Sequence, residues 1–172
     1  PITALARLAK KGNIVRLTGM SDQQQLAFRH DRVRDWLFID AALSMERRNE
    51  LPNAILADPY YAEVVGGVLL QLEENSARLE KVKQLNPLAM FCALKMAGSA
   101  KTPTRALLKD AICEWLEKSE VHSDSNLHVR WHASSILAQT DSPDVISIAA
   151  KFKDRFPNLR LARLRNGDLV AG

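Results

Sequence analysis

The sequence predicts a mainly α-helical protein with a short β-hairpin near its N-terminus. Strand-like runs of apolar and β-branched residues occur only between residues 14 and 28. From residue 51 onward, apolar residues recur at the three- and four-residue spacing of amphipathic helices. In that part of the chain a helix-capping residue stands directly before proline at Asp58-Pro59, Asn86-Pro87, Thr102-Pro103 and Ser142-Pro143.

The first 48 residues predict a helix, a hairpin and a second helix. Residues 3–11 are strong helix formers, and Gly12 follows them as a C-terminal cap. Two strands and a further helix, which Asp31 is placed to cap, are expected at residues 14–17, 24–28 and about 32–45. This order matches the second half of a winged helix-turn-helix domain. We therefore expect residues 1–48 to form a truncated winged helix, and the chain to be a fragment of a longer protein.

Residues 49–172 predict a series of short helices, each with one apolar stripe. The clearest stripes follow Pro103 and Pro143, and consist of Leu107, Leu108, Ala111, Ile112, Trp115 and Leu116, and of Val145, Ile148, Ala149 and Phe152. The caps Thr102 and Ser142 are 40 positions apart, close to the period of a HEAT-type helical hairpin. We expect residues 49–172 to form stacked antiparallel helical hairpins of this kind.

Composition favours a soluble, cytoplasmic protein. Hydrophobic residues make up 47% and charged residues 26% of the sequence, which is typical of globular domains. No apolar run approaches the ~20 residues that cross a bilayer, and the N-terminus lacks the pattern of a signal peptide. Cys92 and Cys113 both lie in apolar helical patterns, so we expect buried free thiols in a reducing compartment.

No catalytic or metal-binding pattern stands out. A P-loop at residues 98–102 would need glycine where Ala100 and Lys95 stand, so Gly98 is interpreted as a helix C-cap and Thr102 as the next N-cap. His128 and His132 share one helix face, but no acidic residue lies between them, which favours a solvated or inter-repeat face over a zinc site. The sequence therefore predicts no catalytic residue, no metal ligand and no enzymatic activity for this chain.

Nucleic-acid binding is left open but is not favoured. The net charge of +4 comes from two basic ends around an acidic middle. The predicted N-terminal helix carries Arg7, Lys10 and Lys11, yet its face is poor in side chains that read base edges.

Two adjacent glycines, Gly66 and Gly67, lie in the middle of a predicted helix. They should lower helix stability by about 1–2 kcal/mol relative to alanines, and close helix packing is the favoured explanation over a hinge.

The run Phe28-Arg29-His30-Asp31 holds the candidate binding residue. His30 lies at the predicted junction between strand and helix, where its imidazole could donate a hydrogen bond to an anion. Together with the residues 32–37 that follow, this run resembles the end of the winged-helix domain in STAND-type NTPases, the NACHT and NB-ARC signalling ATPases. In that family a Met-His-Asp-like motif occupies this junction, and its histidine contacts the β-phosphate of bound ADP and holds the closed, inactive state.

The resemblance implies that His30 senses ADP and that Asp31 caps the helix, with Arg29 in place of the family's methionine. Residues 56–66 also look like the helical connector that follows the winged helix in prokaryotic members. The phosphate-binding loop, the Mg²⁺-binding acid and the sensor arginine would then lie in an upstream NTPase domain, which would hold ADP or ATP with Mg²⁺. The chain would be its regulatory part, with helical repeats that bind an unidentified protein or ligand.

Two other functions fit the sequence. One is a winged-helix transcription regulator with a helical ligand-binding domain, for which DNA binding should fall steeply with salt. The other is a HEAT-like protein-interaction scaffold that does not depend on nucleotide.

Overall fold

A computed structural model of the chain describes residues 15–18, 25–28, 31–72, 76–98, 102–118, 124–140 and 142–152. The chain divides into two compact units, Pro1–Ala41 and Ala42–Gly172. This division falls within helix α2, Asp31–Arg47, whereas the sequence places the domain boundary after residue 48, beyond the end of that helix. That boundary stays a prediction.

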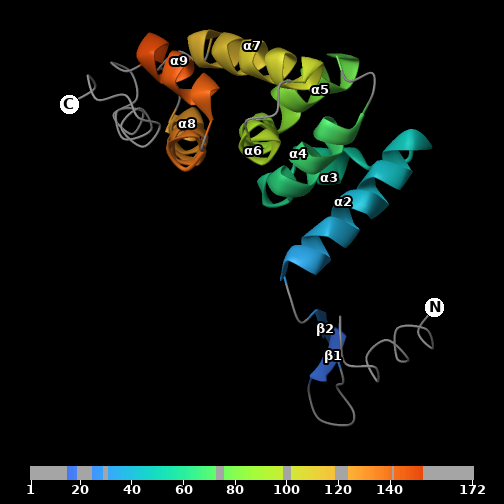
Figure 1. Cartoon of the computed structure of the whole chain (residues 1–172). Coiled ribbons are helices and arrows are strands. Elements are labelled where there is room, and N and C mark those ends of the chain that lie inside the picture. The colour runs from blue at the N-terminus through green and yellow to red at the C-terminus, as the bar shows by residue number, and fades with distance from the viewer. Residues whose placement is uncertain are drawn as a thin grey trace. The chain divides into compact units, whose positions relative to one another are not determined.

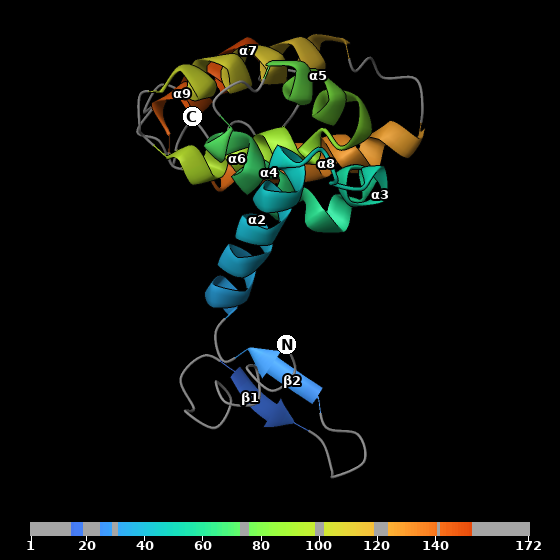
Figure 2. The same ribbon diagram turned by 90° about the vertical axis from the view of Figure 1, so that its right-hand side faces the viewer.

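The first unit contains two short strands that pair in antiparallel fashion (Figure 2). Strand β1 spans Val15–Thr18 and strand β2 spans Gln25–Phe28, with Val15 opposite Phe28. Both lie within one residue of the strands expected from the sequence, but their role as the wing of a winged helix stays a prediction. The helix expected at residues 3–11 lies outside the described residues.

Helix α2 begins at Asp31, which is its first residue, whereas the sequence predicts Asp31 as the cap of a helix that starts at about Arg32. Arg34 lies one turn further along and forms an ion pair with the Asp31 carboxylate at 3.2 Å. An acidic residue in the first turn is favourable because it faces the positive end of the helix dipole. The junction at which His30 was expected to act is therefore followed directly by a helix.

The described part of the second unit is helical throughout apart from short connections, as the sequence predicts (Figure 1). A 3₁₀ turn, η1, spans Pro59–Tyr61. The α-helices after α2 are α3 Asn53–Ala57, α4 Ala62–Gln71, α5 Ser76–Leu85, α6 Leu88–Ala97, α7 Pro103–Lys118, α8 Asp124–Ala138 and α9 Pro143–Phe152.

These helices alternate between two layers. Helix α6 packs against α4 and α8 in one layer, and α7 packs against α5 and α9 in the other. Both views show α5, α7 and α9 together on one side and α4, α6 and α8 on the other (Figures 1 and 2). The layers are joined because α6 also contacts α5 and α7. Helix α6 is thus surrounded by neighbours, and its residues Leu88–Leu94 are all buried.

The apolar stripe predicted after Pro143 is confirmed, since all four of its residues are buried. The stripe after Pro103 is mostly confirmed, with Leu108 and Ile112 almost fully buried. Leu107 was wrongly included, because its side chain is 43% exposed at the edge of the stripe. Arg105 instead takes a buried position on α7, where its guanidinium reaches Asp144 and Ser142 of the α9 N-terminus at 2.6 and 2.8 Å.

The predicted proline-adjacent caps have different outcomes. Asp58 and Thr102 are confirmed as caps, since their side chains accept hydrogen bonds from the backbone N–H groups of Tyr60 and Arg105. The expectation for Asn86 was wrong. Its amide instead donates to the Asp58 carbonyl at 3.0 Å, and helix α6 begins at Leu88 without a side-chain cap. Asn86 is 1% exposed, so its side chain fastens the α5–α6 turn to the η1 segment rather than capping a helix.

Gly66 lies at the contact between α4 and α6. A Cβ atom at this position would meet the Ala89 carbonyl oxygen at 2.8 Å and the Ala93 backbone nitrogen at 2.9 Å. Such distances leave no room for any side chain, because both neighbours are backbone atoms of the central helix. The prediction that this glycine serves close helix packing is confirmed for Gly66.

An ion-pair network joins α5 to α7 and makes stability depend on pH. Glu114 accepts hydrogen bonds from Lys118 and, at 2.8 Å, from Lys83. These bonds, with that from Lys118 having the larger effect, lower the pKa of Glu114 from 4.5 to about 2. A carboxylate with a lowered folded-state pKa stabilises the fold above its unfolded pKa, and this stabilisation is lost as the pH falls. We therefore expect Glu114→Gln to lower the urea midpoint at pH 7, with the difference disappearing between about pH 4.5 and pH 2.

Asp110→Asn is the matched control for this experiment, because Asp110 is an exposed carboxylate on the same helix without an ion pair among the described residues. Its urea midpoint should follow that of the unmodified chain at both pH values. A Glu114→Gln difference that persists unchanged at pH 2 would show that the network does not act through the Glu114 charge.

Candidate functional site

The residues that the sequence singled out for nucleotide sensing, Arg29 and His30, lie outside the described residues. Their proposed contact with ADP therefore stays a prediction. Asp31, the third residue of the motif, is the first residue of α2. The candidate site lies in the second unit.

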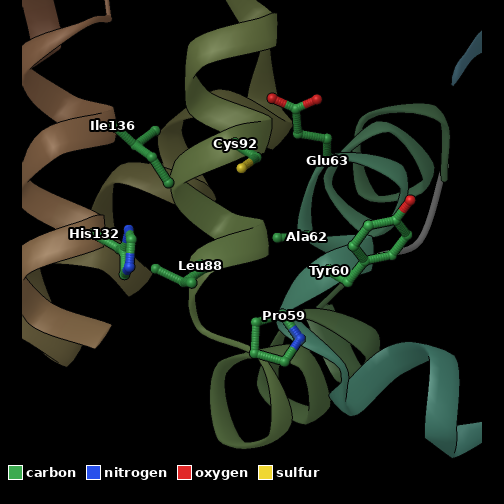
Figure 3. A pocket seen from close by; sticks show the side chains of 8 residues that line it. All are labelled: Pro59, Tyr60, Ala62, Glu63, Leu88, Cys92, His132 and Ile136. Atoms are coloured by element: carbon green, nitrogen blue, oxygen red, sulfur yellow. The ribbon is translucent and has the colours of Figure 1, made fainter. Parts of the chain in front are cut away.

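A pocket opens on the layer formed by α4, α6 and α8, with a volume of about 410 Å³ (Figure 3). Pockets that bind small-molecule ligands typically have volumes of about 300–1,000 Å³. We call this the Glu63 pocket. Its lining consists of Pro59, Tyr60, Ala62, Glu63, Leu88, Cys92, His132 and Ile136.

Three helices in one layer place these side chains together. Leu88 and Cys92 lie one turn apart on α6, and His132 and Ile136 lie one turn apart on α8. Residues four positions apart share a helix face, so each helix presents two side chains to the pocket. Figure 3 shows the α6 pair between the α8 residues on one side and the η1–α4 residues on the other.

The α4 side of the pocket is held in place by the η1 turn. Asp58 caps this turn and also receives the Asn86 amide on its carbonyl. Tyr60 follows, with a side chain that is 81% exposed and a ring that meets Tyr61 edge-on at 5.1 Å. The wall beside α4 is therefore fixed by hydrogen bonds, while a large ring stands at its rim.

Cys92 contributes apolar surface rather than a nucleophile. Burial is the main cause of the rise in the pKa of its thiol to about 12, and the negative charge of Glu63 also contributes to this rise. A thiol with so high a pKa stays protonated at neutral pH, and it is the thiolate that attacks electrophiles and binds metals. The chemistry of the Glu63 pocket is therefore that of binding: a mostly apolar lining with one carboxylate and one imidazole.

Both histidines of α8 are exposed, which confirms the solvated face expected from the sequence. His132 reaches the pocket and meets the exposed Trp131 ring edge-on at 5.1 Å. Among the described residues, no group of three or more histidine, cysteine or acidic side chains is close enough to hold a metal ion.

The segment that the sequence analysis compared with a P-loop adjoins a helix at each of its described ends. Gly98 has φ +56° and ends α6, and Thr102 caps α7. Both assignments agree with the sequence analysis, while residues 99–101 lie outside the described residues.

Comparisons with models of protein families, with curated proteins and with solved structures give no match to this chain. Within the helices that the structure describes, none combines the length and apolar character that a membrane crossing requires.

Sequence reasoning missed the Glu63 pocket. Its walls come from three segments that are far apart in the chain, and only the layer arrangement brings them together. One signal could have pointed to it: the spacing of four residues recurs at Pro59 and Glu63, at Leu88 and Cys92, and at His132 and Ile136. Without knowing that α4, α6 and α8 are neighbours, this recurrence has no particular meaning.

Proposed function

We propose that this chain is the regulatory part of a STAND-type nucleotide switch, in which the helical unit binds a partner and the segment around His30 contacts ADP. The sensing role is supported by the Glu63 pocket, whose lining includes residues of three helices in one layer. The side chains of this pocket are suited to binding a ligand rather than to catalysis. Proteins built from stacked helical repeats commonly bind their ligands on one face of the stack.

The nucleotide role rests on the resemblance of Arg29-His30-Asp31 to the family motif. In the proposed switch, ADP bound by an upstream NTPase domain favours a closed arrangement, in part through His30. A partner on the helical unit favours the open arrangement. Each ligand can shift this equilibrium only by the difference in its affinity for the two states.

The proposal predicts how the longer protein and the isolated chain bind ADP and DNA. The longer protein should retain ADP through purification, whereas residues 1–172 alone should bind it at least about 100-fold more weakly, because most phosphate contacts would lie in the absent domain. Isothermal titration with ADP and a gel-shift assay with duplex DNA are the measurements.

A winged-helix transcription regulator would give the opposite pattern. DNA binding would then fall steeply with salt and would be lost on charge reversal of Arg7 and Lys11. That result, with no retained ADP, would replace the switch by the DNA-binding function. Neither ADP nor DNA binding would leave a nucleotide-independent scaffold and reject the switch.

A further inference from the structure

We propose that the Glu63 pocket receives a lysine or arginine side chain from a partner polypeptide. This inference deepens the sensing role of the proposed function by naming the chemistry of the partner. It is tested in the chain alone, without nucleotide, so its failure and the failure of the nucleotide switch can be told apart.

The lining of the Glu63 pocket is mostly apolar and has a carboxylate at its edge. Ala62, Leu88 and Ile136 provide aliphatic surface, and the protonated thiol of Cys92 continues it. Lysine and arginine carry an aliphatic stem with a cation at its tip, and they bury the stem along apolar surface while the head stays near water or an anion. A lining of this kind, with a carboxylate at its edge, suits both parts of such a side chain.

The negative charge of Glu63 is not neutralised by another described residue. Within the described part of the chain, its carboxylate makes no ion pair or hydrogen bond. Its charge nevertheless reaches the pocket, since it acts on the Cys92 thiol. Lys95 is the other charge that acts there, but its ammonium lies 3.5 Å from Gln139 of α8 and is not part of the lining. A cation entering the pocket would therefore find an available carboxylate.

The surroundings of the pocket favour a polypeptide over a free amine. Two large aromatic side chains lie exposed beside it: Tyr60 at 81% on the η1 side and Trp131 at 60% next to His132. Exposed aromatic residues are enriched in protein–protein interfaces because they supply large contact areas at low entropic cost. A peptide that inserts one basic side chain could cover both rings with its neighbours.

The experiment uses three peptides that differ at one residue. The first is acetyl-Ala-Leu-Lys-Leu-Ala-amide, and the others carry norleucine or glutamate in place of lysine. Each is titrated into ¹⁵N-labelled chain while the amide signals of Tyr60, Glu63, Cys92 and His132 are followed. The lysine peptide should shift these signals and bind about 2- to 5-fold more tightly than the norleucine peptide, as expected for one exposed ion pair.

Two variants decide the role of the carboxylate. Glu63→Gln should remove the advantage of lysine over norleucine and leave the affinity for the norleucine peptide unchanged. Lys95→Gln is the matched control and should keep that advantage. The proposal is overturned if no peptide shifts these signals, if the glutamate peptide binds as well as the lysine peptide, or if the advantage of lysine survives in Glu63→Gln.

Discussion

Gly66→Ala should destabilise the helical unit by about 1–2 kcal/mol, although alanine is the better helix former. In an exposed helix this change would stabilise by about 1 kcal/mol. At Gly66 the added methyl group would lie 2.8 Å from the Ala89 carbonyl oxygen and 2.9 Å from the Ala93 nitrogen. Because these are backbone atoms of α6, relief requires the two helices to move apart, and overpacking of this kind commonly costs 1–3 kcal/mol. Urea unfolding followed by circular dichroism at 222 nm measures the change.

A second variant separates the backbone clash from a side-chain clash. The Met96 methyl group would also lie close to the new Cβ, at 3.1 Å, but it is the end of a flexible side chain. Gly66→Ala should therefore lose the same free energy in a Met96→Ala background as in the unmodified chain. If Gly66→Ala proves neutral or stabilising, α4 and α6 do not pack as closely as described. Recovery of stability in the double variant would instead assign the clash to Met96.

The same packing matters for binding. Helix α4 carries Ala62 and Glu63, and α6 carries Leu88 and Cys92, so the α4–α6 distance sets the width of the Glu63 pocket. A glycine at the contact lets two backbones approach more closely than any other residue would. Gly66 therefore affects the geometry of the Glu63 pocket as well as the stability of the helical unit.

Helix positions and buried faces could be predicted because they depend on local spacing. The four buried residues of α9 follow the helical period, and Asp58 and Thr102 precede prolines as helix-start residues do. Gly66 could be assigned to close packing because a glycine in mid-helix needs a compensating reason.

Features that depend on a distant partner could not be predicted. Arg105 is buried because Ser142, 37 positions later, accepts its hydrogen bond and Asp144 supplies a countercharge. Asn86 fastens a turn rather than capping a helix because the Asp58 carbonyl lies within its reach. The sequence contains all five residues but does not show that they meet. The Glu63 pocket was missed for the same reason, since neighbouring helices in its layer are separated in the chain by helices of the other layer.

In the proposed switch, His30→Ala should greatly weaken ADP retention by a protein that joins this chain to the proposed NTPase domain, and should raise its basal activity. A hydrogen bond to a charged group is worth about 1.5–3 kcal/mol, so the loss of a histidine contact with the β-phosphate should speed ADP release by about 10- to 100-fold. The substitution also removes the contact that is proposed to hold the closed state, and the open state should become more populated.

His128→Ala is the matched control, because His128 is an exposed histidine of α8 in the helical unit. It should leave ADP release unchanged, which separates an effect of His30 from a general effect of losing a histidine. The release rate is measured with a fluorescent ADP analogue chased by unlabelled ADP, alongside the ADP content of the purified protein. The proposed switch predicts low ADP content and fast release in His30→Ala alone. Equal ADP content, release rate and basal activity in the unmodified protein and His30→Ala would contradict it.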